Sequence, residues 1–132
     1  MITVVQTQAY HATGNIKYID QAAKEAVLYL DSLQKPNGLF YHAPDVPFFW
    51  GRGNGWVVGA LARVMNYLPE DYHSRDKYEK HFVQIMSRIV ELQGADGYWR
   101  SSLLDPESYP SKETSATGFY TYALWWGINN GL

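Results

Sequence analysis

The feature that most constrains the fold is an alternation between helical segments that lack charge and helical segments that carry it. The segments predicted at 2–13, 54–68 and 114–130 hold among them a single Asp, Glu, Lys or Arg. The segments predicted at 17–34 and 76–93 have one apolar face at helical spacing and charges on the other faces. An uncharged helix is typical of a buried position, whereas a helix with one apolar face borders water. The alternation therefore predicts an all-α fold with two layers of helices.

The connections between these helices are short and long in turn. Gly14-Asn15 ends the first helix within a tight turn, whereas residues 35–53 and 94–113 form long connections, which commonly carry function. Lys17-Tyr18 returns as Lys77-Tyr78 about 60 residues later, after one helical hairpin and its loop. This repeat predicts a stack or ring of helical hairpins, of which two copies form only a part.

The composition excludes several classes of protein. The absence of cysteine excludes a disulfide framework, a zinc-thiolate site and a cysteine nucleophile. No segment is apolar over the length of a membrane span, and 13 acidic against 11 basic residues provide no basic face for nucleic acid. No cluster of histidines and carboxylates predicts a metal, and nothing predicts a cofactor. The 11 Tyr, 5 Trp and 5 Phe instead favour a carbohydrate site, because sugars stack on flat aromatic rings.

The stretch richest in candidate functional groups is GLFYHAPDVPFFWGRGNGW at residues 38–56. Its glycines allow a ligand to approach the backbone closely. Arg52 can bind a carboxylate through two parallel hydrogen bonds, and Trp50 and Trp56 offer stacking surfaces, although each tryptophan alone also fits a place in the core. Asn54 is expected to cap the third helix, whose first N–H groups would then face an anion.

Two further residues complete the predicted site. His42 is a candidate proton donor or hydroxyl-binding group, although a lone loop histidine also fits an exposed polar position. Asp45 is the carboxylate of this loop, whereas those of the second long loop fit turns and a helix start that Thr114 or Ser115 is expected to cap. The predicted substrate-binding residues are therefore His42, Asp45, Trp50, Arg52, Asn54 and Trp56.

These motifs resemble the signature of a known family. The string FWGRGNGW at 49–56, preceded by GLFYHAPD at 38–45, is similar to glycoside hydrolase family 105, the unsaturated rhamnogalacturonyl hydrolases. That family is related to the unsaturated glucuronyl hydrolases of family 88, and Asn54-Gly55 favours family 105 of the two. The string ETSAT at 113–117 is similar to the family as well, and the resemblance runs through almost the whole chain.

The resemblance implies an (α/α)6 toroid and a hydrolase that acts in pectin degradation or on the products of other polysaccharide lyases. Such enzymes remove a 4,5-unsaturated uronic acid from the non-reducing end of an oligosaccharide. An aspartic acid protonates the vinyl ether, water adds at C5, and the resulting hemiketal opens and releases the remaining sugar. The resemblance places His42, Trp50, Arg52 and Trp56 in the substrate pocket.

The resemblance also implies that part of the family fold is missing. The general acid of the family precedes a helix whose continuation residues 1–4 resemble, so the catalytic Asp is expected upstream of Met1. Residues 1–132 are thus expected to form a single incomplete domain that binds an unsaturated oligosaccharide without turning it over. Self-association through the flanks of the first and fifth helices is expected. No signal peptide is visible, but in a fragment this absence says nothing about the compartment of the parent. The expected location is cytoplasmic, with the periplasm as the alternative.

Two other functions fit an α/α toroid. The first is a non-catalytic carbohydrate-binding or interaction module that reuses the framework. The second is a toroid with an apolar cavity like that of terpene cyclases, which the absence of an Asp-rich metal motif disfavours.

Overall fold

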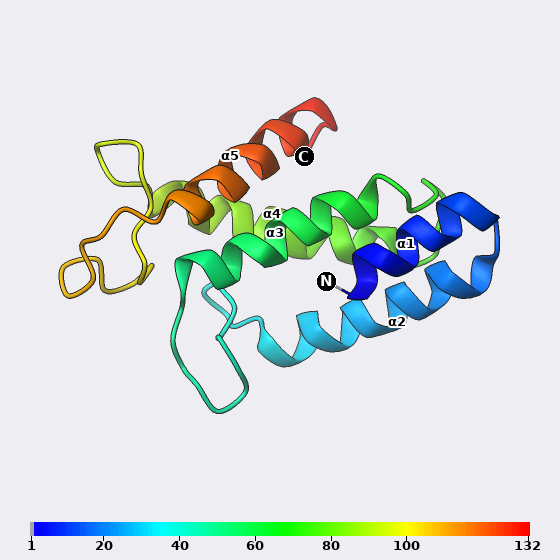
Figure 1. Cartoon of the computed structure of the whole chain (residues 1–132), viewed down its shortest axis with the longest axis horizontal. Coiled ribbons are helices and arrows are strands. Elements are labelled where there is room, and N and C mark those ends of the chain that lie inside the picture. Colours follow the sequence, from blue (N-terminus) through cyan, green and yellow to red (C-terminus); the bar gives the residue numbers. More distant parts are fainter. Residues whose placement is uncertain (1) are drawn as a thin grey trace.

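The computed structural model describes residues 2–132 and shows five α-helices joined by loops (Figure 1). The helices are α1 (Ile2–Thr13), α2 (Ile16–Leu33), α3 (Gly51–Met65), α4 (Arg75–Glu91) and α5 (Thr114–Asn129). Within these residues, β-pairing is limited to four isolated bridges. The prediction of an all-α fold is therefore confirmed. None of the helices described is both long and apolar enough to cross a membrane.

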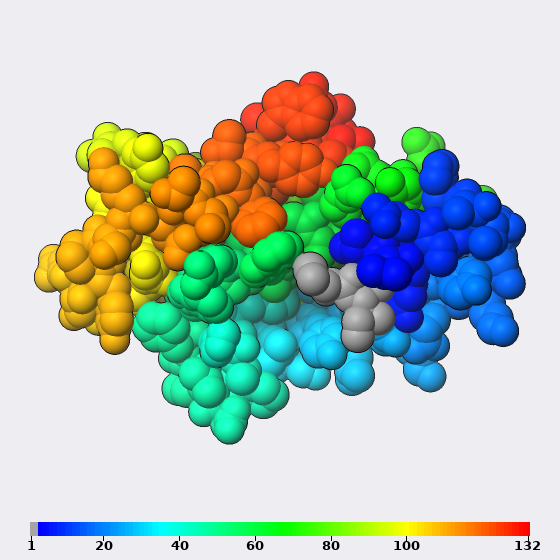
Figure 2. Space-filling model, in the orientation of Figure 1, coloured from blue at the N-terminus to red at the C-terminus, as the bar shows by residue number. Residues whose placement is uncertain are grey.

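The helices poor in charge (α1, α3 and α5, here called the uncharged layer, in which only α3 carries charged residues, Arg52 and Arg63) and the charged helices α2 and α4 lie in separate layers, as their patterns predict. In the uncharged layer α3 contacts α1 and α5, while α2 packs against α1, and α4 against α3 and α5. The core lies between the layers. It includes Ile19, Ala23, Leu30, Tyr78, Phe82, Ile85 and Ile89 from the charged helices and Val58, Leu61, Ala62, Met65, Ala116, Tyr120 and Ala123 from the uncharged ones. On the other side of the uncharged layer, atoms of α3 (green) are exposed between those of α5 (orange) and α1 (blue), as Figure 2 shows.

The turn between α1 and α2 is built by its two predicted residues. Gly14 has a φ of 67°, in the left-handed region that favours glycine, and its N–H donates to the Tyr10 carbonyl at 2.7 Å. The side chain of Asn15 then accepts from the Lys17 N–H at 3.2 Å and caps α2. The short connection brings α1 and α2 together as an antiparallel hairpin (Figure 1).

The internal repeat of the sequence is a repeated turn in the structure. After α2 the side chain of Gln34 donates to the Gly38 carbonyl at 2.9 Å, and after α4 the side chain of Gln93 donates to the Gly97 carbonyl at 2.9 Å. Both glycines have a positive φ, 84° and 79°. The aromatic residue two positions after each glycine is buried. Both long loops therefore leave their helices through the same anchored turn, which confirms the hairpin repeat.

Candidate functional site

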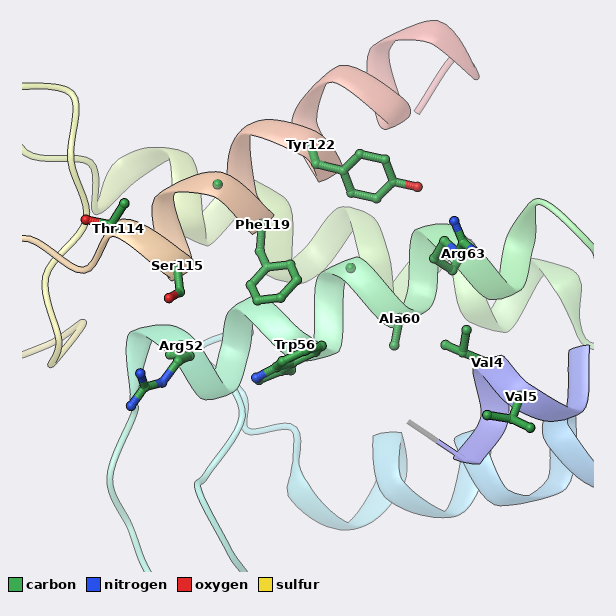
Figure 3. A pocket seen from close by; sticks show the side chains of 12 residues that line it. Val4, Val5, Arg52, Trp56, Ala60, Arg63, Thr114, Ser115, Phe119 and Tyr122 are labelled. Carbon is green, nitrogen blue, oxygen red and sulfur yellow. The ribbon is translucent and has the colours of Figure 1, made fainter. Parts of the chain in front are cut away.

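A cavity of about 750 Å³ lies on the open side of the uncharged layer, between α1, α3 and α5 (Figure 3). It is lined by Val4, Val5, Arg52, Trp56, Gly59, Ala60, Arg63, Thr114, Ser115, Gly118, Phe119 and Tyr122. Aromatic and aliphatic side chains thus surround two guanidinium groups and three hydroxyl groups. Mostly apolar walls with a few polar groups are typical of a site for a small organic ligand.

The helical spacing of α3 directs three side chains to this cavity. Arg52, Trp56 and Arg63 share one face because residues four and eleven positions apart lie on the same side of a helix. Between them Gly59 allows Phe119 of α5 to come close, since a Cβ on Gly59 would lie 3.1 Å from Phe119 Cδ1. The Trp56 and Phe119 rings are 4.6 Å apart between centroids, at 48° (Figure 3). The close packing of α5 on α3 therefore builds an aromatic wall.

The start of α3 differs from the prediction. The helix begins at Gly51, and Trp50 rather than Asn54 is its N-cap residue. The side-chain oxygen of Asn54 accepts from the Phe40 N–H at 2.8 Å, and its Nδ2 donates to the carbonyls of Phe40 at 3.0 Å and Trp50 at 3.1 Å. The prediction that Asn54 caps the helix is wrong. Its side chain, 2% exposed, is not brought to the cavity, because its amide holds the first long loop onto the first turn of α3.

The first residue of α3 is fixed from three directions. The Gly51 N–H donates to the Ser101 carbonyl at 2.8 Å, and the buried Tyr120 hydroxyl donates to the Gly51 carbonyl at 2.6 Å. A Cβ on Gly51 would lie 2.5 Å from the Arg100 carbonyl oxygen, so only glycine fits there. Burial raises the pKa of Tyr120 far above its ordinary value, which keeps the hydroxyl protonated as a donor. These contacts set the position of Arg52, the next residue.

Arg52 lies at one end of the cavity and packs on Trp50. Its guanidinium carbon is 4.4 Å from the centroid of the Trp50 ring. None of the ion pairs found within residues 2–132 involves Arg52, whose side chain is exposed. A cation over an aromatic face at an exposed site contributes about 0.5–1 kcal/mol. Trp50 therefore orients the guanidinium without neutralising its charge, and the N–H groups of Arg52 remain available to bind an anion.

His42 lies on a neighbouring surface. Its ring is 5.1 Å from that of Trp50 in an edge-to-face arrangement at 74°, and the backbone N–H of His42 donates to the Phe48 carbonyl at 3.0 Å. His42, Phe48 and Trp50 line a shallow hollow of about 280 Å³. The structure thus groups the predicted residues in two pairs, Arg52 with Trp56 in the cavity and His42 with Trp50 in the hollow. The contact between Arg52 and Trp50 joins the two.

Asp45 is not brought to either surface. It lies in the turn that the Ala43–Val46 bridge closes, where the Val46 N–H donates to the Ala43 carbonyl at 3.1 Å. Its side chain is exposed and lines neither the cavity nor the hollow. An aspartate in a tight exposed turn is common for conformational reasons alone.

Comparison with known families gives a match over the whole chain. The sequence model described as Glycosyl Hydrolase Family 88 aligns with residues 1–132. The chain belongs to glycosyl hydrolase family 88.

Individual relatives agree with this assignment. An unsaturated 3S-rhamnoglycuronyl hydrolase of Formosa agariphila is 52% identical over 100 residues, which cover 76% of this chain and 25% of that protein. The solved structure of a family 88 glycosyl hydrolase from Bacteroides vulgatus superimposes with a TM-score of 0.91 and 32% identity, over 98% of this chain and 41% of that one. A family 105 glycoside hydrolase of C. acetobutylicum superimposes with a TM-score of 0.88 at 22% identity, over 98% of this chain and 41% of that one, which shows a common fold.

The resemblance inferred from the motifs is thus confirmed, with family 88 as the family whose sequence model matches. The two layers of helices in this family 88 chain are part of an (α/α)6 toroid. The chain spans a quarter of the length of the Formosa relative and about two fifths of the Bacteroides structure.

Carboxylates near the second long loop of this family 88 chain have structural tasks. Glu113, rather than Thr114 or Ser115, caps α5, because its side chain accepts from the Ser115 N–H at 3.2 Å, so the predicted caps are wrong. Asp96 accepts from Arg100 at 3.1 Å, and this hydrogen bond, together with those from Lys112 and the Tyr98 N–H, lowers the pKa of Asp96 to about 2. No carboxylate of residues 2–132 lines the cavity. No group of three metal-binding side chains occurs in this part of the chain.

Several lining residues escaped the sequence interpretation. Thr114, Ser115, Phe119 and Tyr122 come from α5, and Arg63 comes from the third helical turn beyond Arg52. The sequence signal for the α5 contribution is the pair of glycines at positions 55 and 59, which are four residues apart on the face that receives Phe119. Nothing in the local sequence identifies α5 as the helix that packs against these two glycines.

Proposed function

We propose that this chain forms part of the substrate-binding wall of an unsaturated uronyl hydrolase. The enzyme removes a 4,5-unsaturated uronic acid from the non-reducing end of an oligosaccharide released by a polysaccharide lyase. The observation that carries the proposal is the joint presence of Arg52 and Trp56 in one cavity, beside the hydroxyl groups at the start of α5. A sugar ring with a carboxylate matches this combination of a flat aromatic surface, a guanidinium and hydroxyl groups.

Each of these residues has a distinct task in the proposal. Arg52 binds the uronic acid carboxylate, because its guanidinium is held on a ring and makes no ion pair within residues 2–132. Trp56, supported by Phe119, packs against the sugar ring. Thr114 and Ser115 offer hydroxyl groups to the sugar hydroxyls (Figure 3). His42, which packs on Trp50 at the outer side of the site, binds a sugar hydroxyl there.

The reaction itself needs an acid that these residues do not supply. In the family mechanism an aspartic acid gives its proton to the vinyl ether carbon C4, and the oxygen of water bonds to C5 while the water's proton passes to the aspartate. The neutral hemiketal then opens and releases the remaining sugar. The cavity wall described contains guanidinium and hydroxyl groups and no carboxylic acid. We therefore assign binding and orientation to this chain and proton transfer to an aspartic acid outside residues 2–132. In this proposal residues 1–132 form one domain that is an incomplete toroid.

A second function deserves a direct test. The absence of a carboxylate from the described cavity wall also fits a non-catalytic carbohydrate-binding module on the same framework. The double bond of the substrate absorbs ultraviolet light and hydration removes that absorbance, so turnover of an unsaturated rhamnogalacturonan disaccharide can be followed directly. The absorbance is followed with this chain alone and with the chain joined to the upstream segment of a family member, and only the joined form separates the two functions.

We expect this 132-residue chain to bind the disaccharide without loss of absorbance. General acid catalysis alone typically contributes about 10²- to 10⁴-fold to a rate. Turnover by this chain that disappears in the Asp45→Asn variant would show that Asp45 is the acid and that the assignment of roles is wrong. Turnover that appears only when a family member's upstream Asp-containing segment is joined to the chain would support the enzyme over the binding module.

We also propose that copies of this chain associate through the exposed flanks of α1 and of α5, the latter where it borders α4. A groove of about 180 Å³ lies there, lined by apolar residues that include Val83, Val90 and Leu132. Trp125 and Ile128 of α5 are 63% and 75% exposed. Contiguous exposed apolar surface of this kind marks an interaction site. A second copy can cover it with the apolar side chains that α1 and α2 expose, among which Val5 is 66% exposed.

A further inference from the structure

The two long loops are joined by their backbones at the edge of the proposed site. The Leu103 N–H donates to the Phe49 carbonyl at 3.0 Å, and Trp50 pairs with Ser102 in an antiparallel bridge. Ser102 and Leu103 are 3% and 4% exposed, so this junction is buried. The second loop is therefore held at a fixed position relative to Trp50, and the residues that follow Leu103 extend beside the hollow.

An aromatic pair extends from this junction. The rings of Phe48, in the first loop, and Tyr109, in the second, lie 5.6 Å apart between centroids, edge to face at 67°. Tyr109 is 49% exposed and is not among the residues of the hydrophobic core. A tyrosine that leaves half of its surface in water on a loop gains little from burial, whereas its flat face suits an apolar ligand surface.

The aromatic pair is continuous with the proposed binding site. Phe48 shares the hollow of about 280 Å³ with His42 and Trp50, and Trp50 is the ring on which Arg52 packs. A path of aromatic rings therefore runs outward from the cavity, from Arg52 over Trp50 and Phe48 to Tyr109. If Arg52 holds the carboxylate of the terminal uronic acid, the rest of the oligosaccharide has this path as its route to solvent.

We infer that Phe48 and Tyr109 form a stacking surface for the sugar residues beyond the second residue of an unsaturated oligosaccharide. The ligand class is a neutral or uronic pyranose in a chain longer than a disaccharide, which presents its C–H face to the rings. The shallow, aromatic character of the surface favours stacking over directed hydrogen bonds, so it selects for chain length more than for sugar identity. The inference rests on the proposed function, because it takes Arg52 as the site of the terminal carboxylate.

The test compares two ligands on several variants of the chain by isothermal titration calorimetry. The ligands are an unsaturated disaccharide and an unsaturated tetrasaccharide from one lyase digest. We expect Tyr109→Ala and Phe48→Ala to weaken tetrasaccharide binding by about 3- to 10-fold and to change disaccharide binding by less than about 2-fold. Tyr109→Phe, which keeps the ring, should bind both ligands as the wild type does. Tyr18→Ala removes a half-exposed ring on α2, away from the site, and should change neither affinity.

The outcomes distinguish the inference from the function on which it rests. If Tyr109→Ala leaves tetrasaccharide affinity unchanged while the disaccharide still binds, the stacking surface is refuted and the proposed function stands. Equal loss of affinity for both ligands would show that Tyr109 only supports the loop beneath Trp50, which also refutes the surface. If the wild-type chain binds neither ligand, the proposed function and the inference fall together. Circular dichroism melting of each variant shows whether an affinity change reflects lost folding.

Discussion

Asn54→Ala should lower the free energy of unfolding by about 2–5 kcal/mol, because it leaves two buried backbone groups without partners. The side chain of Asn54 pairs with both the N–H and the carbonyl of Phe40, and Phe40 is 3% exposed. Water therefore has little access to these two groups after the substitution. A buried polar group that loses its partner costs about 1–3 kcal/mol. The lost bond to the Trp50 carbonyl adds a smaller amount.

Asn54→Asp adds a pH dependence to the same position. The introduced carboxyl can still accept from the Phe40 N–H, but its other oxygen meets the carbonyls of Phe40 and Trp50, which favour a proton there. Burial and these carbonyls raise the folded-state pKa of the carboxyl above its unfolded value of about 3.9. The folded state then binds the proton more strongly than the unfolded state. The free energy of unfolding is therefore highest below about pH 4 and falls as the pH rises through the folded-state pKa.

Urea denaturation followed by circular dichroism between pH 4 and pH 8 measures both effects. Asn129→Ala is the matched control, because the exposed Asn129 donates only to the Trp125 carbonyl of its own helix. Its effect should stay within about 0.5 kcal/mol. An Asn54→Ala variant as stable as this control would refute the anchoring role of Asn54. The same conclusion would follow if the stability of Asn54→Asp, relative to the wild type, did not change with pH.

Two further predictions concern packing and association. Gly51→Ala should lower the free energy of unfolding by about 1–3 kcal/mol, since its Cβ would lie 2.5 Å from the Arg100 carbonyl oxygen. Gly118→Ala should raise the free energy of unfolding by about 0.5–1 kcal/mol, since this helical position has nothing within 4 Å of an added Cβ. A Gly51→Ala variant that unfolds at a higher temperature than Gly118→Ala would contradict the packing at Gly51. Multi-angle light scattering should show species larger than the monomer at high concentration. Trp125→Ser should raise the monomer fraction, and Leu104→Ser, an exposed position in the second long loop outside the proposed contact, should not. A strictly monomeric wild type would argue against association through these helix flanks.

The helices and their layers could be predicted because they depend on short-range periodicity. Three segments hold a single charged residue among them, whereas two others carry charges on all but one face, and this pattern assigns inner and outer positions. The repeated Gly38 and Gly97 turns were visible for the same reason, since each is fixed by residues within a few positions. The start of α3 could not be predicted in this way, because Asn54, a residue type favoured as a helix cap, instead binds Phe40, which lies 14 residues away in the sequence.

The candidate site was predictable only in part. Arg52 and Trp56 share the cavity because they are four residues apart on one helix, which the sequence contains. The separation of His42 from Arg52 by Trp50, and the exposed turn that holds Asp45, depend on the path of the loop and on its pairing with residues 101–103. The contribution of Phe119 depends on the packing of α5 against α3, which joins residues about 60 positions apart.

The measurement that tests the central claim most directly is the affinity of the chain for an unsaturated disaccharide with and without the Arg52 guanidinium. A charge-assisted hydrogen bond contributes about 1.5–3 kcal/mol, so Arg52→Ala should weaken binding by roughly 10- to 150-fold. Arg88→Ala removes a guanidinium that pairs with Glu91 on α4, away from the cavity, and should leave the affinity unchanged. The methyl ester of the same disaccharide, which lacks the carboxylate charge, should bind the wild type and Arg52→Ala with nearly equal affinity. An unchanged dissociation constant in Arg52→Ala for the charged disaccharide would contradict the assignment of this cavity as the uronide site.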